Sequence, residues 1–291
     1  EIETLRFADG SIWNVDMMKE FAVLGTTEVD NLVGFAQDDI MEGYAADDTL
    51  IGLGGDDSLT GGLGNDTLDG GPGRDTYHFS LGDGADVIQN YDTSTNRHDV
   101  IEFSEGITEA DVRVQRSGED LYLFIGDSGD RITVEDYFIG EGHGSYAVDE
   151  IKFNDGISWD IEKVKDLSVL GTEAGDLLNG FSGADHMEGY GGNDTISGQG
   201  GNDDIDGGTG DDLLDGGTGS DIYHFRPGDG QDVIQNYDIS ADRHDVIEFG
   251  DGIVQEDVLV KRLEDDLYLI IGDGSDQLMV EDFFLNEALG A

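Results

Sequence analysis

Apolar side chains recur at every ninth position along two stretches of the chain. They are Leu32, Met41, Leu50, Leu59, Leu68 and Tyr77 in the first stretch, and Leu178, Met187, Ile196, Ile205, Leu214 and Tyr223 in the second. This step is too short for a pair of helices, but it fits a tight turn followed by a short strand whose middle side chain points inward. Two such half-turns complete one coil, so each strand should lie parallel to the equivalent strand of the next coil. The pattern predicts two β-solenoids.

An aspartate stands two residues before each of these apolar positions. The twelve are Asp30, Asp39, Asp48, Asp57, Asp66, Asp75, Asp176, Asp185, Asp194, Asp203, Asp212 and Asp221. Stacked coils would bring neighbouring carboxylates to about 5 Å, where they repel by roughly 3 kcal/mol at an effective dielectric constant near 20. A Ca²⁺ ion, which binds oxygen at about 2.3–2.6 Å, spans that gap better than Mg²⁺, which requires shorter bonds and a stricter octahedron. We therefore predict Ca²⁺ between stacked aspartates.

Glycine pairs precede the aspartates in the most regular turns, as in "GGLGNDTLD" from Gly61 and "GGTGDDLLD" from Gly207. These glycines should adopt the left-handed backbone that turns carbonyl oxygens toward an ion. Those assigned to the metal sites are Gly62, Gly64, Gly71, Gly73, Gly208, Gly210, Gly217 and Gly219. Three turns at the start of the first roll, "GTTEVD" from Gly25, "GFAQDD" from Gly34 and "GYAADD" from Gly43, lack the second and fourth glycines, and whether these degenerate turns bind calcium stays open.

A shift of 146 residues overlays the chain on itself without a gap: "DVIQNYD" at 86–92 recurs at 232–238. This repeat predicts five segments: residues 1–24 as the end of a preceding unit, with a strand and a short helix; 25–89 as the first roll; 90–170 as a β-rich extension with a linking helix; 171–235 as the second roll; and 236–291 as a truncated second extension. Both ends fall within a unit, and the closing "LNEALGA" lacks the "VDEIKF" of the first copy. We expect an excerpt of a longer tandem array.

Each extension loses the nine-residue period but keeps short β-branched and aromatic runs, which predict about six to eight strands that extend or cap the roll without calcium. "GDGADVI" from Gly82 resembles one more turn after a two-residue insertion, so Asp86 and its copy Asp232 should close the last metal site. The two rolls would together bind about eight to ten Ca²⁺ ions. Short linking helices should follow Trp13 and Trp159, with Asn14 and Asp160 as N-caps.

The charge narrows the possible partners. The chain carries 67 acidic and 14 basic side chains, a formal net charge of −53, which argues against nucleic acid or an anionic membrane as a partner. Its 37% of hydrophobic residues is too high for a disordered acidic chain. There is no cysteine, and no apolar run approaches the length of a membrane span. Cations are the countercharge that a compact fold requires.

Candidate catalytic groups have simpler explanations. His78, His98 and their copies His224 and His244 come without a nucleophile motif, and zinc would need three or four converging ligands. Paired aspartates could suggest a glycosidase, but their repetition favours metal binding. No stretch matches an EF-hand or a P-loop. The two tryptophans fit core positions better than sugar-stacking platforms. We predict that the chain is not an enzyme and has neither catalytic nor organic-cofactor sites.

The nonapeptides beginning at Gly61 and Gly207 resemble the GGxGxDxUx repeat of RTX proteins, for which a calcium-binding parallel β-helix is described. The stretch after them resembles the haemolysin-type calcium-binding related segment. The resemblance implies an all-β fold of two tandem calcium-stapled β-rolls, each followed by a calcium-free β extension. It also implies export by the type I secretion machinery to the exterior or to the bacterial cell surface.

Two functions are compatible with this resemblance. We favour a structural module that folds and stiffens on binding Ca²⁺ within a long adhesin, surface fibre or filament, and whose partners are neighbouring repeat units of the same or of identical chains. The alternative is a C-terminal secretion and folding module of a toxin or secreted hydrolase whose active domain lies outside this chain. The organism, the number of repeats and any receptor cannot be read from these residues.

Overall fold

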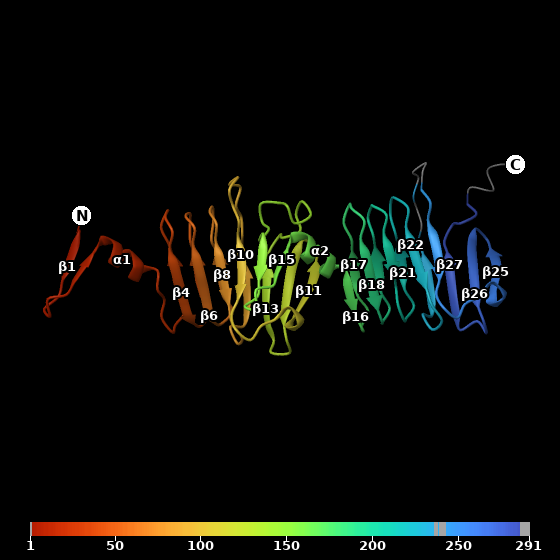
Figure 1. Ribbon diagram of the computed structural model, residues 1–291, viewed down its shortest axis with the longest axis horizontal. Coiled ribbons are helices and arrows are strands. Elements are labelled where there is room, and N and C mark those ends of the chain that lie inside the picture. Colours follow the sequence, from red (N-terminus) through yellow and green to blue (C-terminus); the bar gives the residue numbers. More distant parts are fainter. Residues whose placement is uncertain (1, 236–237, 239–242, 286–291) are drawn as a thin grey trace. The chain divides into compact units, whose positions relative to one another are not determined.

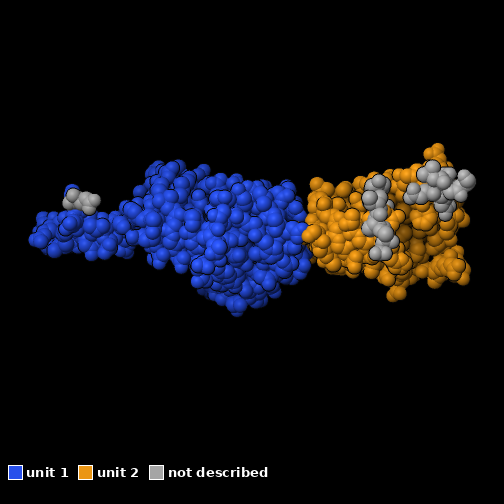
Figure 2. Space-filling model, turned by 90° about the horizontal axis from the view of Figure 1, so that it is seen from above, with its two compact units in different colours: residues 1–167 blue, residues 168–291 orange. Residues whose placement is uncertain are grey.

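The computed structural model describes residues 2–235, 238 and 243–285 (Figure 1). The chain divides into two compact units, residues 1–167 and 168–291 (Figure 2). Nearly all regular structure is β-strand, with two short helices in the described part, so the predicted all-β class is confirmed. Parts of the predicted second extension, residues 236–237, 239–242 and 286–291, lie outside the described residues.

The described helices and strands follow one another along the chain in this order. In the first unit they are β1 (Thr4–Arg6), β2 (Ile12–Asn14), α1 (Val15–Ala22), β3 (Asn31–Val33), β4 (Ile40–Ala45), β5 (Thr49–Ile51), β6 (Ser58–Leu63), β7 (Thr67–Asp69), β8 (Thr76–Phe79), β9 (Ala85–Ile88), β10 (Val100–Phe103), β11 (Val112–Ser117), β12 (Asp120–Ile125), β13 (Asp130–Val134), β14 (Glu150–Lys152) and β15 (Ser158–Asp160), followed by α2 (Ile161–Ser168). The second unit contains β16 (Leu170–Thr172), β17 (Leu177–Asn179), β18 (His186–Tyr190), β19 (Thr195–Ser197), β20 (Asp204–Asp206), β21 (Leu213–Asp215), β22 (Ile222–Phe225), β23 (Gln231–Ile234), β24 (Val246–Phe249), β25 (Val258–Leu263), β26 (Asp266–Ile271) and β27 (Asp276–Val280). Short 3-10 helices, Glu109–Asp111 and Gln255–Asp257, precede β11 and β25.

Successive strands of each roll alternate between two parallel sheets. In the first unit the sheet orders are β15-β14-β10-β8-β6-β4 and β11-β12-β13-β9-β7-β5-β3. Leu50 lies opposite Leu32 on one side and Leu68 on the other, which is the predicted offset of 18 residues. The second unit repeats this arrangement as β16-β18-β20-β22-β24 and β17-β19-β21-β23-β27-β26-β25. The stacked coils can be followed in Figure 1, and they establish the parallel β-roll.

The core lies between the two sheets of each roll. Its inward positions are the apolar residues of the nine-residue pattern, and Leu50, Leu59, Leu68 and Tyr77 are completely buried. Burying one such leucine contributes roughly 1.5–3 kcal/mol. The period of the pattern therefore reflects one inward side chain per strand.

The extension continues both sheets beyond the roll. β13 pairs in parallel with β9 and carries the antiparallel strands β12 and β11, while β14 pairs in parallel with β10 and carries β15. Both predicted N-caps are present: the Asn14 side chain accepts the Met17 N–H at 2.9 Å, and Asp160 accepts that of Lys163 at 2.9 Å. Trp159 is buried whereas Trp13 is only half-buried.

Candidate calcium sites

The aspartates of each roll form hydrogen-bonded ladders along both edges. The backbone N–H of Asp30 donates to Asp48 Oδ1 at 2.7 Å, and that of Asp48 donates to Asp66 Oδ1 at 2.7 Å. On the other edge Asp39 donates to Asp57 and Asp57 to Asp75, at 2.8 and 2.9 Å. The stacking is as expected, but a backbone N–H of the preceding coil, rather than a second carboxylate, faces Oδ1 of Asp48, Asp57, Asp66 and Asp75. The ladder hydrogen bonds therefore satisfy Oδ1 of these aspartates but not Oδ2.

The second unit contains the same ladders. Asp176 donates to Asp194 and Asp194 to Asp212, while Asp185 donates to Asp203 and Asp203 to Asp221, over 2.7–2.9 Å. The structure thus brings all twelve periodic aspartates into four ladders.

The other carboxylate oxygen divides the aspartates into two classes. In eight of them Oδ2 is buried and has no hydrogen-bond partner: Asp48, Asp57, Asp66, Asp75, Asp194, Asp203, Asp212 and Asp221. We call the turns that end in these residues the inner turns. A buried ionised oxygen without a partner is strongly unfavourable, so native proteins pair such groups or bind a cation to them.

The first two turns of each roll, which we call the opening turns, satisfy Oδ2 internally. Asp30 Oδ2 accepts the N–H of Thr26 at 2.6 Å, and Asp39 Oδ2 accepts that of Phe35 at 2.5 Å. Asp176 and Asp185 accept the equivalent N–H groups of Thr172 and Phe181, each at 2.6 Å. These four carboxylates therefore need a cation less than those of the inner turns.

Backbone conformation separates the two classes of turn. The second residue of an inner turn has a positive φ, as in Gly62 at 96° and Gly71 at 83°. Tyr44 and Leu53 occupy the same place one coil earlier with φ of 75° and 78°, although such values are uncommon for residues other than glycine. Thr26 does not adopt this conformation, and its N–H reaches the carboxylate.

Seven of the eight glycines predicted for the sites have a positive φ, and Gly73 does not. The expectation of a left-handed backbone is therefore wrong for Gly73, which follows Pro72. A Cβ at Gly73 would overlap the carbonyl oxygen of Gly55, so a close approach between coils requires the glycine.

Burial raises the pKa of the inner carboxylates. It is the largest cause for Asp57 and Asp66, whose pKa values rise to about 6, and for Asp75, whose pKa rises to about 8. Neighbouring carboxylates raise these values further. In the second unit the pKa of Asp203 rises to about 7 and that of Asp212 to about 6, for the same reasons. Near neutral pH these groups require either a proton or a nearby positive charge.

Asp86 and Asp232 continue the ladders beyond the roll. The N–H of Asp66 donates to Asp86 Oδ1 at 2.8 Å, and that of Asp212 to Asp232 Oδ1 at 3.0 Å. Burial, followed by the charges of nearby aspartates, raises both pKa values to about 8. The two-residue insertion therefore leaves the stacking of this edge intact.

The ladder that runs through Asp57 and Asp75 ends in residues that sequence reasoning missed. The N–H of Asp75 donates to Asp99 Oδ1 at 3.0 Å, and the N–H of Asp99 donates to Asp149 Oδ2 at 3.0 Å. In the second unit Asp221 donates to Asp245 at 3.2 Å. The available signal was an aspartate two residues before a buried apolar residue, as in Asp99 before Ile101, but longer loops interrupt the period here.

The residues fit a cation that takes backbone oxygens. Among the described residues, no three His, Cys, Asp or Glu side chains converge as a metal site, but backbone carbonyl oxygens lie close to the carboxylates of the inner turns. A Cβ at Gly43 would meet both Asp48 Oδ2 and the carbonyl oxygen of Gly61. A carboxylate oxygen and a carbonyl oxygen thus border the same small space, and Ca²⁺ prefers such oxygen ligands.

Histidines contact polar neighbours on the outer faces of the sheets. His78 Nε2 lies 3.0 Å from Ser58 Oγ, and His98 Nε2 lies 3.2 Å from Glu150 Oε2. His224 contacts Asp204 in the second unit. These contacts agree with the structural role expected for the histidines.

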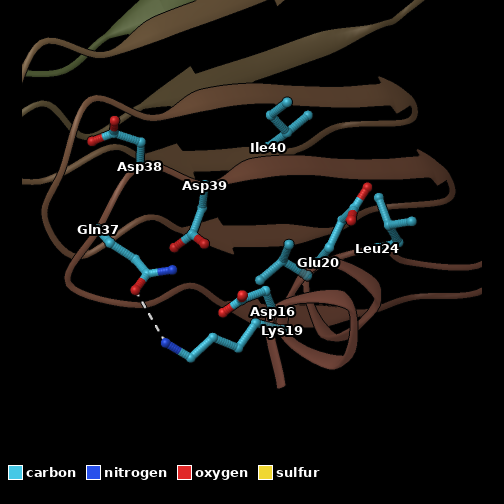
Figure 3. A pocket seen from close by; sticks show the side chains of 9 residues that line it. Asp16, Lys19, Glu20, Leu24, Gln37, Asp38, Asp39 and Ile40 are labelled. Carbon is cyan, nitrogen blue, oxygen red and sulfur yellow. Dashed lines mark hydrogen bonds between the residues drawn. The ribbon is translucent and has the colours of Figure 1, made fainter. Parts of the chain in front are cut away.

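A separate hollow of about 320 Å³ lies between α1 and the first coil of the first unit (Figure 3). Asp16, Lys19 and Glu20 border it from the helix, and Asp38 and Asp39 from the roll. Lys19 Nζ donates to Gln37 Oε1 at 3.1 Å across this hollow, as the dashed line in Figure 3 shows. The helix thereby contacts the opening turns and partly covers the start of the roll.

Comparison with protein families agrees with this geometry. A family model described as the RTX calcium-binding nonapeptide repeat (4 copies) matches residues 23–50, 42–77, 170–205, 179–214 and 197–234. The turns of both rolls are RTX calcium-binding repeats. A second model, the haemolysin-type calcium binding protein related domain, matches residues 120–163. Both rolls of the chain therefore carry calcium-binding repeats of RTX type.

Similar proteins match parts of this RTX chain. The iron-regulated protein FrpA of Neisseria meningitidis serogroup C is 38% identical over 102 residues, which are 35% of this chain and 9% of FrpA. The chain thus matches only a small part of that relative.

Two solved structures show partial similarity. One is the AlgE6R3 subunit of the Azotobacter vinelandii mannuronan C5-epimerase, with 29% identity, a TM-score of 0.30, and coverage of 39% of this chain and 74% of that one. The other is the extracellular lipase LipA from Serratia marcescens, with 17% identity, a TM-score of 0.30, and coverage of 88% of this chain and 38% of that one. Within the described residues, no helix is long and apolar enough to cross a membrane.

Proposed function

We propose that this RTX chain is a structural module that folds and stiffens on binding Ca²⁺ outside the cell. The observation that carries the proposal is the set of eight buried Oδ2 atoms without a hydrogen-bond partner, one in each inner turn. These atoms recur with the coils, as the ligands of a repeated site must. Calcium supplies the positive charge and the preference for oxygen ligands that such a site requires.

The chain's own residues prepare these sites. Each ladder hydrogen bond fixes the carboxylate rotamer, and the left-handed turn keeps the N–H of its second residue away from Oδ2. The glycines permit the close approach of carbonyl oxygens from the next coil. We infer that Asp48, Asp57, Asp66, Asp75 and their copies are the main ligands, and that Asp86 and Asp232 close the last sites. We expect these residues to hold about eight to ten ions.

The proposed context is a secreted tandem-repeat protein, such as an adhesin or a surface fibre. RTX repeats support export by type I secretion, and the roughly eight to ten Ca²⁺ ions expected to bind outside the cell would offset part of the net charge of −53. Successive repeat units would then be the module's partners. We propose a mechanical role rather than a catalytic one. The aspartates of the inner turns are assigned to the proposed metal sites, and His78, His98 and His224 contact polar side chains of neighbouring strands.

Calcium titration tests this proposal. We expect the chain to lose most of its β circular dichroism signal in EDTA and to regain it at millimolar Ca²⁺, since binding energy becomes folding energy when the apo site is unstable. Titration calorimetry on the same samples would count the ions, and equal Mg²⁺ would serve as the matched control. A chain that is equally folded in EDTA and in Ca²⁺ would contradict the proposal.

A further inference from the structure

In a regular inner turn, carbonyl groups of the following coil accept the N–H groups of the first and fourth residues. Gly52 donates to the carbonyl oxygen of Asp69 at 2.7 Å, and Gly55 donates to that of Pro72 at 3.3 Å. The second unit contains the same pair of hydrogen bonds between its coils. Each regular turn therefore depends on backbone oxygens of the next coil.

At the last turn of the first roll, which ends in Asp75, side chains replace these carbonyl groups. The N–H of Gly70 donates to the Tyr77 hydroxyl oxygen at 3.0 Å, and the N–H of Gly73 donates to Asp92 Oδ2 at 3.3 Å. Asp92 belongs to the extension and lies outside the nine-residue pattern. Side-chain oxygens thus stand where another coil would supply backbone oxygens.

The second unit makes the same substitution at its last turn. The N–H of Gly216 donates to the Tyr223 hydroxyl oxygen at 2.8 Å, and the N–H of Gly219 donates to Asp238 Oδ2 at 3.3 Å. All four residues are the copies, 146 positions later, of those that make these contacts in the first unit. The arrangement is therefore a feature of the repeat rather than of one turn.

The last aspartate of each roll still has one carboxylate oxygen without a donor. Oδ2 of Asp75 and Oδ2 of Asp221 are both buried and have no hydrogen-bond partner, and both residues are completely buried. A Cβ at Gly216 would meet Asp221 Oδ2 and also the Tyr223 hydroxyl oxygen. A second oxygen thus borders the space beside the unpaired Oδ2, as a carbonyl oxygen does in the regular turns.

The charges around this turn are negative. Burial is the largest cause of the raised pKa of Asp75, which is about 8, and the carboxylates of Asp99, Asp57 and Asp92 raise it further. Asp92 is itself only 1% exposed. Buried carboxylates that lie this close to one another require a positive charge near neutral pH.

Asp92 retains capacity for a ligand, whereas Asp99 serves the ladder. Asp99 Oδ1 accepts the Asp75 N–H at 3.0 Å, and its Oδ2 accepts the Asn90 amide at 2.9 Å. Asp92 Oδ1 accepts the Ser94 N–H at 2.6 Å, and Oδ2 accepts the Ser94 hydroxyl at 2.7 Å. With the glycine contact described above, these donors use three of the about four lone-pair sites of an ionised carboxylate. One site remains for a cation.

We infer that Asp92 and its copy Asp238 are calcium ligands, and that each binds one ion together with the last aspartate of its roll. Asp75 is the partner of Asp92 in the first unit, and Asp221 is the partner of Asp238 in the second. Other oxygens of the last turn complete the coordination, which Ca²⁺ accepts in mixed sets of carboxylate, carbonyl and water. The inference rests on the proposed function, because it requires that the last aspartate of the roll binds Ca²⁺.

Such an ion would connect the extension to the roll. The sequence predicts an extension without calcium, because the nine-residue pattern ends before it. With Asp92 as a ligand, the extension has no repeat of its own but supplies one carboxylate to the last repeat. Calcium would then order the start of the extension together with the end of the roll.

Titration calorimetry with Ca²⁺ tests this assignment. Asp92→Asn keeps an oxygen that can accept the Gly73 N–H but removes the charge, so we expect one ion to bind at least about tenfold more weakly. Adding Asp238→Asn should weaken a second ion to the same degree. Asp120→Asn is the matched control, because Asp120 Oδ1 accepts the Asp136 N–H at 2.8 Å within the extension, and it should leave calcium binding unchanged.

Diffraction from crystals of the unmodified chain grown in Ca²⁺ gives a test that does not depend on the folding of a variant. Anomalous scattering at long wavelength distinguishes Ca²⁺ from water. We expect an ion within about 2.3–2.6 Å of both Asp75 Oδ2 and an Asp92 carboxylate oxygen. An ion that contacts Asp75 but not Asp92 would overturn the inference.

These measurements separate the inference from the proposed function. Unchanged calcium binding in Asp92→Asn, or equal weakening in Asp92→Asn and Asp120→Asn, would overturn the role of Asp92 and leave the proposed function intact. A chain that binds no Ca²⁺ at any inner turn would overturn both.

Discussion

The opening and inner turns of each roll have the same length and the same aspartate, but Oδ2 of that aspartate has a hydrogen-bond donor only in the opening turns. In an opening turn the N–H of Thr26 or Phe35 satisfies the carboxylate, whereas in an inner turn Oδ2 of Asp57 is buried without a partner. The difference is the backbone conformation of the second residue of the turn. Where the second residue does not have a positive φ, its own N–H satisfies the carboxylate. Where its φ is positive, Oδ2 of the aspartate has no hydrogen-bond donor and needs a cation. The comparison teaches that a repeated aspartate alone does not identify a site.

Removing calcium should affect this comparison most. In EDTA we expect amide hydrogen exchange at inner positions such as the Asp48 N–H, which donates to Asp66, to accelerate at least about a hundredfold. The reason is that several buried carboxylates lose their countercharge together. Adding back Ca²⁺, but not Mg²⁺, should restore protection. Protection that is unchanged in EDTA would show that the inner turns are as self-sufficient as the opening turns.

The next largest effect should come from neutralising one carboxylate. Asp57→Asn keeps an acceptor for the Asp39 N–H but removes the charge, and it should raise the calcium midpoint of folding by about tenfold. Asp39→Asn is the matched control in an opening turn, where an amide oxygen can still accept the Phe35 N–H. We expect that variant to shift the midpoint by less than about twofold. Equal shifts, measured by circular dichroism during calcium titration, would remove the distinction between the two classes.

A backbone substitution tests the cause of the distinction. Gly62 has a φ of 96°, and a Cβ there would overlap the carbonyl oxygen of Tyr44, so Gly62→Ala should destabilise the calcium-bound fold by about 2 kcal/mol or more. Thr26→Ala changes the equivalent position of an opening turn and removes the two hydrogen bonds of Oγ1, which donates to Asp30 and accepts the Glu28 N–H, for a loss of about 1 kcal/mol. Urea unfolding at fixed Ca²⁺ measures both. A smaller loss for Gly62→Ala than for Thr26→Ala would contradict the conformational explanation.

Acid should have a smaller effect, in the direction that the raised pKa values require. Burial raises the pKa of Asp57 to about 6 and that of Asp203 to about 7, above the ordinary value of 3.8. A group with a raised pKa in the folded state contributes stability below its unfolded pKa and loses that contribution as pH rises through the folded value. In chelator, the β signal should therefore increase as the pH falls from about 8 to about 5.

Asp57→Asn should respond less to acid, because its amide is already neutral. Sodium chloride added at pH 8 is the control for general screening of the net charge. A β signal that falls as the pH is lowered through this range would contradict the assignment of raised pKa values to the inner carboxylates.

Much of this structure could be read from the sequence, and the limits have physical causes. The spacing of Leu50 and Asp48 predicts the coil, its stacking offset and the ladder, because one buried side chain and one edge aspartate recur in each half-coil. The spacing does not predict that Tyr44 adopts a left-handed backbone, since nothing in "GYAADD" requires it. Tyr44 pairs with Gly62 of the next coil, a neighbour that only the folded roll brings to it. Asp99 and Asp149 were missed because a ladder requires closeness in space, which loops of variable length provide as well as a fixed period does.

The hydrogen bonds of the ladder all point the same way along the chain. The N–H of Asp48 is satisfied by Asp66, that of Asp66 by Asp86, and that of Asp75 by Asp99. Each coil is therefore completed by residues that are synthesised after it. A nascent roll that emerges from the ribosome N-terminus first always ends in a coil whose partner has not yet been made. The direction of the ladder thus leaves only the last coil made without acceptors for its aspartate N–H groups, until the next coil has been synthesised.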